Sequence, residues 1–117
     1  MWDVDVELVS EWLESLDAAS LRQVIAALQI LQEQGPALGR PLVDTVAASR
    51  HRNMKELRPG SSGRSELRIL FAFDPARSAI FLLGGDKSGD WDRWYKKNIP
   101  LADDLFDEHI QKLQEGK

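Results

Sequence analysis

Residues 66–83 read ELRILFAFDPARSAIFLL, and this stretch decides the fold. Its two halves are rich in large apolar residues, and the Asp-Pro pair between them is typical of a tight turn. The pattern predicts two antiparallel strands over 66–73 and 78–83, the second apolar on both faces and therefore central in a sheet. A short strand over 54–58 precedes them. We therefore predict a three-strand meander.

The N-terminal part predicts one further strand and two helices. Residues 2–8 alternate between apolar and acidic side chains, as a strand with one buried face does. A short helix follows Ser10, and a second helix with apolar residues at helical spacing runs from Asp17 to Gly35-Pro36. Residues 35–53 hold two prolines and two glycines and read as a long connection over the domain.

The C-terminal part predicts a last helix. Residues 86–98 are polar and aromatic, after which Pro100 fits the first helical position, with Asp103 and Asp104 in the first turn. The element order β-α-α-β-β-β-α predicts a compact α+β fold, a mainly antiparallel twisted sheet with two N-terminal helices on one side and a C-terminal helix completing the cover. The residues expected to be largely buried are Trp12, Leu21, Ile25, Leu28, Leu70, Ile80 and Leu82.

Composition limits the classes of protein. A chain of 117 residues with 43% hydrophobic and 29% charged residues is typical of one globular domain, here 1–117. With no cysteine it can form neither a disulfide nor a thiolate metal site. Its apolar stretches are much shorter than the roughly 20 residues that cross a bilayer, and its N-terminus is acidic, so we expect a cytoplasmic protein without a membrane partner.

Charge is unevenly distributed along the chain, whose net charge is −4. Residues 50–97 hold 11 Lys and Arg against 6 Asp and Glu, a charge of +5, and the rest holds 4 against 13, a charge of −9. The basic segment is consistent with a binding site for a polyanion. It is equally consistent with solvent-exposed faces on which basic and acidic residues are separated by chance.

Arg68 is the most informative charged residue, because it lies inside the most hydrophobic strand. An unpaired buried guanidinium is too costly to keep, so Arg68 either pairs with Glu66 or Glu56 or emerges on an open face. The same meander carries further cations, namely Lys55, Arg58 and Arg64.

Other motifs allow two interpretations each. Residues 91–97 read WDRWYKK, a mixture of aromatics and cations that suits single-stranded RNA but also suits packing of the last helix. His51 either exchanges protons near neutral pH or is a solvated loop residue, and His109 reads as a helix-surface residue. The spacing of residues 85–92 fits neither a phosphate-binding loop nor a calcium loop, and the histidines are isolated, so no metal or cofactor is expected.

Several strings in this order resemble the HigB branch of the RelE/ParE superfamily of toxin–antitoxin toxins. They are GPALGRPLVD at 35–44, NMKELR at 53–58, FAFDP at 71–75, GGDK at 84–87, and WY at 94–95 leading to IP at 99–100. The strings span almost the whole chain. The chain departs from the family pattern in Asp86 beside Lys87, in Glu56 between the strand cations, and in lacking a dense lysine cluster.

The resemblance implies a metal-independent endoribonuclease that cleaves messenger RNA, typically on the ribosome, and inhibits translation. It also implies a cognate antitoxin as partner, expected to be a helix-turn-helix DNA-binding protein. ParE members share the fold but poison DNA gyrase without cutting RNA, so a non-catalytic, ParE-like toxin stays open as the alternative.

The resemblance also implies site residues. The catalytic candidates are Arg68 to hold the phosphate, Lys87 to support it, and Tyr95 as base or as the group that orients the nucleophile. Tyr95 would serve as a base only if nearby cations favoured its ionised form. Lys55 or Arg58 would neutralise the leaving side. Together with the cations and aromatics that the sequence pattern itself contributes, the RNA-binding candidates are Lys55, Arg58, Arg64, His51, Trp94, Lys96 and Lys97.

Overall fold

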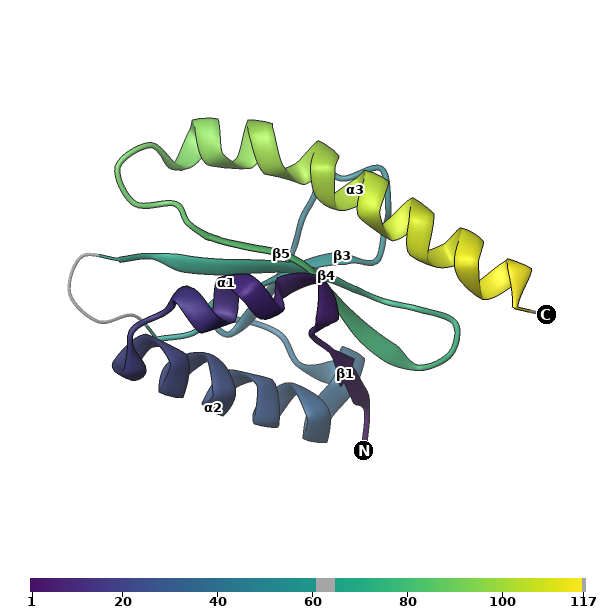
Figure 1. The fold of residues 1–117 in the computed structure, drawn as a ribbon, viewed down its shortest axis with the longest axis horizontal. Coiled ribbons are helices and arrows are strands. Elements are labelled where there is room, and N and C mark those ends of the chain that lie inside the picture. Colours follow the sequence, from purple (N-terminus) through teal and green to yellow (C-terminus); the bar gives the residue numbers. More distant parts are fainter. Residues whose placement is uncertain (61–64, 117) are drawn as a thin grey trace.

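The computed structural model describes residues 1–60 and 65–116, and within them five strands form one mixed sheet (Figure 1). The strands are β1 (Asp3–Asp5), β2 (Val43–Thr45), β3 (Met54–Leu57), β4 (Leu67–Phe73) and β5 (Ser78–Asp86), in the spatial order β1-β5-β4-β3-β2. Neighbours from β2 to β5 run antiparallel, and β1 pairs in parallel with β5. The predicted meander is confirmed as β3-β4-β5.

Helices cover both faces of this sheet. Helices α1 (Ser10–Ser15) and α2 (Ala18–Gln34) lie on one face, and α3 (Trp91–Glu115) lies on the other (Figure 1). Two short 3-10 helices, η1 (Glu7–Val9) and η2 (Gly35–Ala37), flank α1 and α2. The predicted α+β architecture is therefore confirmed. Among the described residues, no helix combines the length and the apolar character needed to cross a membrane.

Strand β4 separates two hydrophobic cores, because its side chains alternate between the faces of the sheet. Ile69 and Phe71 belong to the core under α1 and α2, whereas Leu70 and Ala72 belong to the core under α3. Burying a large apolar side chain contributes roughly 1.5–3 kcal/mol, so a strand buried on both faces stabilises both layers. The same alternation directs Arg68 to the α3 face.

Two predicted elements have different bounds. β1 covers Asp3–Asp5 rather than 2–8, because the Asp5 carboxylate accepts the N–H of Glu7 at 3.0 Å and the chain turns there into η1. The connection over 35–53 was not expected to hold a strand, yet it contains β2, whose Val43 is buried and pairs with Leu57.

The last helix begins at Trp91, not at Pro100 as predicted. The Asp90 side chain accepts the N–H of Arg93 at 3.2 Å and caps the helix. Pro100 lies inside α3 on its exposed side, where water can reach the Lys96 carbonyl that has lost its helical donor. Asp103 and Asp104 are consequently in the middle of the helix rather than in its first turn.

The buried face of α2 also differs from the prediction. The helix buries Ser20, Val24, Ala27 and Leu31, and Ile25, one residue further round the helix, is 45% exposed. The expectation for Ile25 was therefore wrong. Trp12, Leu21 and Leu28 are half-buried, and Leu70, Ile80 and Leu82 are buried as predicted.

Two adjacent glycines near the end of β5 make room for tryptophans on opposite faces. Leu70 pairs with Leu83 and Phe71 with Phe81, so the pairing register shifts between these two positions of β4. Beyond this irregularity a Cβ on Gly84 would collide with the ring of Trp12, and a Cβ on Gly85 would lie 2.6 Å from Trp94 Nε1. Glycine at both positions lets α1 and α3 approach the sheet closely.

Candidate active site

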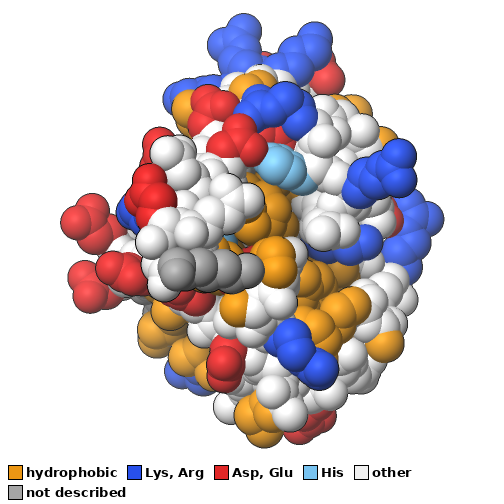
Figure 2. Space-filling model, turned by 90° about the vertical axis from the view of Figure 1, so that its right-hand side faces the viewer, with side chains coloured by type: hydrophobic (Ala, Val, Ile, Leu, Met, Phe, Trp, Pro, Cys, Tyr) orange, Lys and Arg blue, Asp and Glu red, His pale blue; other side chains and the backbone are white. Residues whose placement is uncertain are grey.

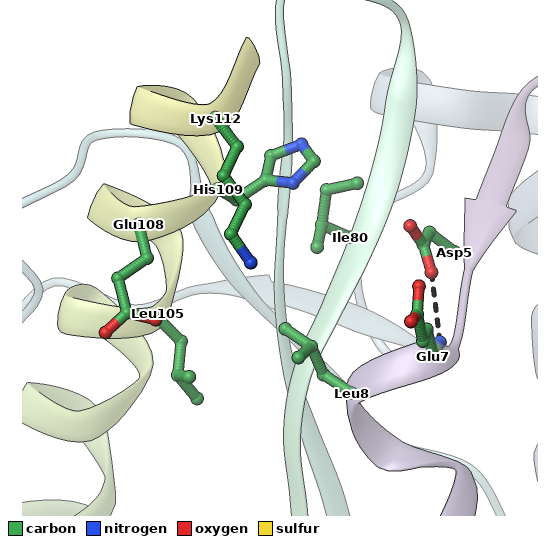
Figure 3. Close-up of a pocket in the computed structure, with 8 residues that line it drawn as sticks. All are labelled: Asp5, Glu7, Leu8, Ile80, Leu105, Glu108, His109 and Lys112. Atoms are coloured by element: carbon green, nitrogen blue, oxygen red, sulfur yellow. Dashed lines mark hydrogen bonds between the residues drawn. The ribbon is translucent and has the colours of Figure 1, made fainter. Parts of the chain in front are cut away.

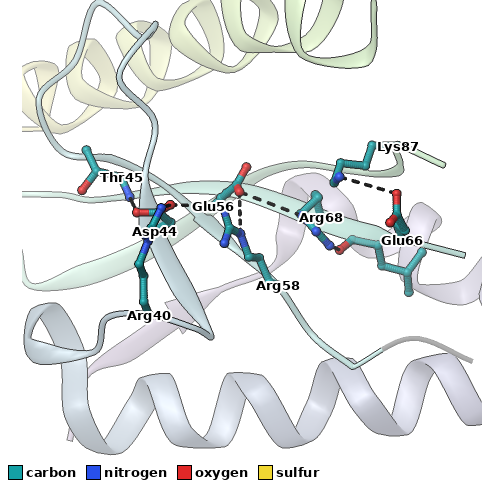
Figure 4. Close-up of polar contacts among 9 residues, drawn as sticks. Arg40, Asp44, Thr45, Glu56, Arg58, Glu66, Arg68 and Lys87 are labelled. Atoms are coloured by element: carbon teal, nitrogen blue, oxygen red, sulfur yellow. Dashed lines mark hydrogen bonds and ion pairs between the residues drawn. The ribbon is translucent and has the colours of Figure 1, made fainter. Parts of the chain in front are cut away.

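A buried carboxylate, Glu56, lies at the centre of the polar group on the α3 face. Glu56 is in β3, and its residue is 4% exposed. Arg58 Nε donates a hydrogen bond to Glu56 Oε1 at 2.7 Å. Arg68, in the neighbouring strand β4, brings its Nε to 4.0 Å from the same oxygen (Figure 4). Two arginines therefore face one buried carboxylate.

Arg68 is only partly satisfied by its neighbours. Its Nη1 donates to the carbonyl of Leu67 at 2.7 Å, and its side chain is 16% exposed. Within the described residues its buried Nε has no hydrogen-bond partner. Of the two acidic partners predicted from the sequence, Glu56 is the one beside Arg68, because Glu66 pairs with Lys87 instead. The guanidinium thus keeps a donor available for an anion.

Arg58 is held on its outer side by β2. Its Nη2 donates to Asp44 Oδ2 at 3.1 Å, and Arg40 Nη2 donates to the same oxygen at 3.0 Å (Figure 4). The hydrogen bond from Arg40, the backbone N–H of Thr45 and the charge of Arg58 hold the pKa of Asp44 below its usual value. Burial opposes the charge of Arg58, but Glu56 and Asp44 outweigh it and raise the pKa of Arg58.

Tyr95, on the first turns of α3, completes the group. Burial raises the pKa of Tyr95 to about 12, and a hydrogen bond and the charge of Glu56 add to this rise, whereas Arg68 opposes it. Arg68 favours the ionised form, but burial and Glu56 outweigh it, so the condition under which Tyr95 would serve as a base is not met. Glu56, absent from the predicted site residues, sits beside the hydroxyl and keeps it neutral.

Lys87 and Trp94 border this group. Lys87 Nζ lies 3.5 Å from Glu66 Oε2, and the lysine side chain is 15% exposed. Trp94 rests on Gly85 and packs its ring at a steep angle against Tyr95, with 5.2 Å between ring centres. Trp94 therefore supports Tyr95 through packing.

Two of the predicted RNA-binding residues do not join the group, and a third lies outside the described residues. Lys55 precedes Glu56 in β3, so it points to the opposite face of the sheet, where its Nζ donates to Thr45 Oγ1 at 3.0 Å. His51 lies against the middle of α3, with its Nε2 2.7 Å from Asp107 Oδ1 and its ring edge-on to Phe106. Arg64 lies outside the described residues.

The loop that carries His51 is fastened to α3 by acidic residues. Asp103, which is buried, accepts hydrogen bonds from the Ser49 hydroxyl and the Arg50 backbone N–H. The Arg50 guanidinium pairs with Asp104 at 3.1 Å and with Asp107 at 2.5 Å. These carboxylates neutralise part of the basic segment, so its sequence charge of +5 overstates the positive potential available to a ligand.

Lys96 and Lys97 flank two grooves along the start of α3. The first groove, of about 450 Å³, runs between Ala48–Arg50 and the helix and is bordered by Tyr95, Lys96 and Ile99. The second, of about 370 Å³, lies beside the β5–α3 connection and is bordered by Trp94 and Lys97. Lys96 pairs with Asp92 at 3.2 Å. Both lysines are exposed and lie close to the aromatic residues.

A third cavity lies at a different part of α3. It has a volume of about 160 Å³ and is bordered by Asp5, Glu7, Leu8, Ile80, Leu105, Glu108, His109 and Lys112 (Figure 3). None of the predicted site residues borders it. His109 is not a simple surface residue, because its Nε2 lies 2.7 Å from the buried Asp74 Oδ2 and ties α3 to the β4–β5 turn.

The end of the molecule at the C-terminus of α3 shows no uniform charge. Figure 2 shows acidic side chains mainly on the left and basic ones mainly on the right, with both kinds at the top and a hollow between them where hydrophobic side chains reach the surface. Within the described residues, no group of three or more His, Asp or Glu side chains is arranged to hold a metal ion.

Sequence reasoning missed Glu56 and Asp44 as site residues. The alternation in β3 carried a signal for Glu56, because it shares a face with Met54 and so must be buried under α3. Asp44 carried none, because its strand was not predicted. Together the group offers a carboxylate that can accept a proton, arginine donors for an anion, and a neutral phenol.

Comparisons with known proteins give one family. Residues 11–107 match the family described as "Phage derived protein Gp49-like (DUF891)". The chain is 58% identical over 116 residues to the candidate toxin HigB2 of Mycobacterium tuberculosis (strain ATCC 25618 / H37Rv), an alignment that covers 99% of this chain and 58% of HigB2. It is 54% identical over 95 residues to the candidate toxin HigB3 of the same strain, covering 81% of each. The chain thus spans less than two-thirds of HigB2.

Proposed function

Because the chain belongs to the Gp49-like family of HigB-type toxins, in the RelE/ParE superfamily, we propose that it is the toxin of a type II toxin–antitoxin system and cleaves messenger RNA. The observation that carries the nuclease activity is the buried Glu56 carboxylate facing Arg58 and Arg68, with the Tyr95 hydroxyl beside it. A proton acceptor next to anion donors is what metal-independent RNA cleavage requires.

Glu56 is our candidate general base. In the proposed reaction its carboxylate takes the proton of a ribose 2′-hydroxyl, and the 2′-oxygen forms a bond to the adjacent phosphorus. The bond from phosphorus to the 5′-oxygen breaks, which leaves a 2′,3′-cyclic phosphate on one fragment. The departing 5′-oxygen needs a proton, and the Lys87 ammonium group is our candidate donor.

Arg68 and Arg58 stabilise the charge that develops on the phosphate. The unpartnered Nε of Arg68 supports its role, because a phosphate oxygen would satisfy this buried donor. Arg58, held by Glu56 and Asp44, neutralises the leaving side. Tyr95 orients the nucleophile as a neutral hydrogen-bond donor, a role that its raised pKa favours over that of a base.

Membership of the family supports a proposal for the substrate and the partners. We propose that the RNA is messenger RNA on the ribosome, that cleavage takes place in the cytoplasm, and that a helix-turn-helix antitoxin inhibits the protein. An acidic or amphipathic antitoxin segment that covers the cations around Arg58 would compete with RNA. Co-expression with the antitoxin should then give a complex that weakens as salt rises.

The deciding experiment is primer extension on cellular messenger RNA after induced expression of the wild type and of Glu56→Gln. We expect discrete cleavage sites with the wild type and about 100-fold less cleavage with the variant, as general-base removal typically gives. Glu108→Gln is the matched control, because it makes the same change at an exposed glutamate of α3, outside the candidate site. Intact messenger RNA together with damaged DNA would instead favour a ParE-like gyrase poison and contradict the proposal.

A further inference from the structure

Trp91 is the exposed tryptophan of this protein. The chain has four tryptophans, and three of them rest on glycines: Trp2 on Gly35, Trp12 on Gly84 and Trp94 on Gly85. Trp91, the first residue of α3, is 59% exposed. Its indole ring is therefore open to contact with another molecule.

Trp91 lies next to the candidate active site, in contact with Tyr95. It is four residues before Tyr95, so the two side chains share one face of α3, and their rings meet edge to face with 6.3 Å between centres. Lys87 Nζ lies 5.9 Å from the centre of the Trp91 indole. The aromatic surface therefore leads from the Tyr95 hydroxyl outward to solvent and carries a cation at its border.

The charges around Trp91 permit a polyanion to approach. Asp90 and Asp92, its sequence neighbours, pair with Arg93 at 3.4 Å and with Lys96 at 3.2 Å. Each flanking carboxylate is thereby offset by a cation of its own. Single-stranded RNA is bound by such a combination, in which bases stack on aromatic rings and phosphates meet lysines and arginines.

We propose that Trp91 is a binding residue that stacks an unpaired nucleobase of the RNA, next to the phosphate that is cleaved. This inference rests on the proposed function and adds a base subsite to it. The sequence pattern had placed Trp94 among the RNA-binding residues; Trp91 takes that role because Trp94 is engaged with Gly85 and Tyr95.

The test uses a short single-stranded RNA with a 2′-deoxyribose at the cleaved position, so that binding is measured without cleavage. We expect Trp91→Ala to weaken its binding roughly 5- to 150-fold, the range that loss of one base–aromatic stack gives, and Trp91→Phe to restore part of the affinity. Leu101→Ala is the matched control, because Leu101 is also an exposed apolar residue of α3. For cleavable RNA, the KM should rise with little change in kcat.

A second probe identifies the contact itself. Replacing the nucleotide beside the cleavage site by an abasic residue should weaken binding by the wild type and leave binding by Trp91→Ala nearly unchanged. If the wild type cleaves RNA but Trp91→Ala binds and cleaves as the wild type does, the base subsite is wrong and the nuclease stands. If Trp91→Ala loses only antitoxin binding, Trp91 belongs to a protein interface. A wild type that cleaves no messenger RNA, either free or on the ribosome, overturns the proposed function, and the subsite with it.

Discussion

Glu56 and Arg68 face each other across neighbouring strands with 4.0 Å between the carboxylate Oε1 and the guanidinium Nε. This separation allows electrostatic attraction but is too long for a hydrogen bond. Arg58 reaches the same oxygen at 2.7 Å. Glu56 therefore has a close partner without Arg68, and Arg68 can be removed without leaving the buried carboxylate unpaired.

The first prediction concerns Arg68→Ala. We expect RNA cleavage to fall about 100-fold, equivalent to about 3 kcal/mol of lost transition-state stabilisation. The melting temperature should change little, because Arg58 continues to bind Glu56. Cleavage assays and thermal melts of the same samples measure both quantities, with Arg22→Ala, at an exposed position of α2, as the control. An Arg68→Ala protein that fails to fold would assign this arginine a structural role.

The second prediction concerns Tyr95, which is the single tyrosine of the chain. Its phenolate absorbance can therefore be titrated without interference from another tyrosine, and we expect a midpoint near 12 rather than the ordinary 10.0. Since the folded state keeps this proton more tightly than the unfolded state does, the free energy of unfolding should fall as the pH rises from about 10 to about 12. Glu56→Gln should lower the midpoint. A midpoint at or below 10 in the wild type would show that cations dominate.

The third prediction concerns the glycines of β5. Alanine at Gly84 or Gly85 would collide with Trp12 or Trp94, and we expect each variant to lose roughly 1–3 kcal/mol of unfolding free energy by overpacking. Gly85→Ala should also lower RNA cleavage more than Gly84→Ala does, because Trp94, which packs on Gly85, also packs on Tyr95. Gly39→Ala is the control, since a Cβ there has no atom within 4 Å among the described residues. Urea unfolding measures the effect, and equal stability of all three variants would contradict it.

The fourth prediction concerns the contact between Asp107 and the loop that carries Arg50. A hydrogen bond from Arg50, and then one from His51, lowers the pKa of Asp107 from 3.8. The stabilisation is therefore present above about pH 3.8 and lost as the pH falls through the lowered pKa. The protection factors of residues 46–53, which correct hydrogen exchange for its intrinsic pH dependence, should fall in acid, and Asp107→Asn should lower them already at neutral pH. Unchanged exchange in Asp107→Asn would show that Asp103 alone holds the loop.

The sequence predicted the meander because period-2 patterning and a turn are local signals. It placed the start of α3 at Pro100 because proline is favoured at the first position of a helix. The helix instead begins at the Asp90 cap, and Pro100 lies inside it on the exposed side. Ile25 fits the predicted apolar face as well as Val24 does, and only contact with the sheet selects Val24. Which apolar side chains of a helix are buried therefore depends on tertiary packing.

The candidate site was predicted in part. Arg68, Lys87 and Tyr95 come from separate parts of the chain, and the resemblance to the family was needed to propose them together. Lys55 could have been separated from Glu56 and Arg58 by parity alone, because it shares a face of its strand with Leu57. The raised pKa of Tyr95 depends on a glutamate brought in from another strand, and no local pattern reports that neighbour.

The Gly84–Gly85 pair fixes the position at which the chain leaves the sheet. Because an indole ring packs against each face of the strand, the last part of β5 is held between the two helical layers without any covalent cross-link. The connection to α3 starts from this anchored point, and the first turn of the helix stands a few residues beyond it. The position of Tyr95 over Glu56 is thus set from both sides of the sheet, so α1, which contributes no group to the site, takes part in aligning it.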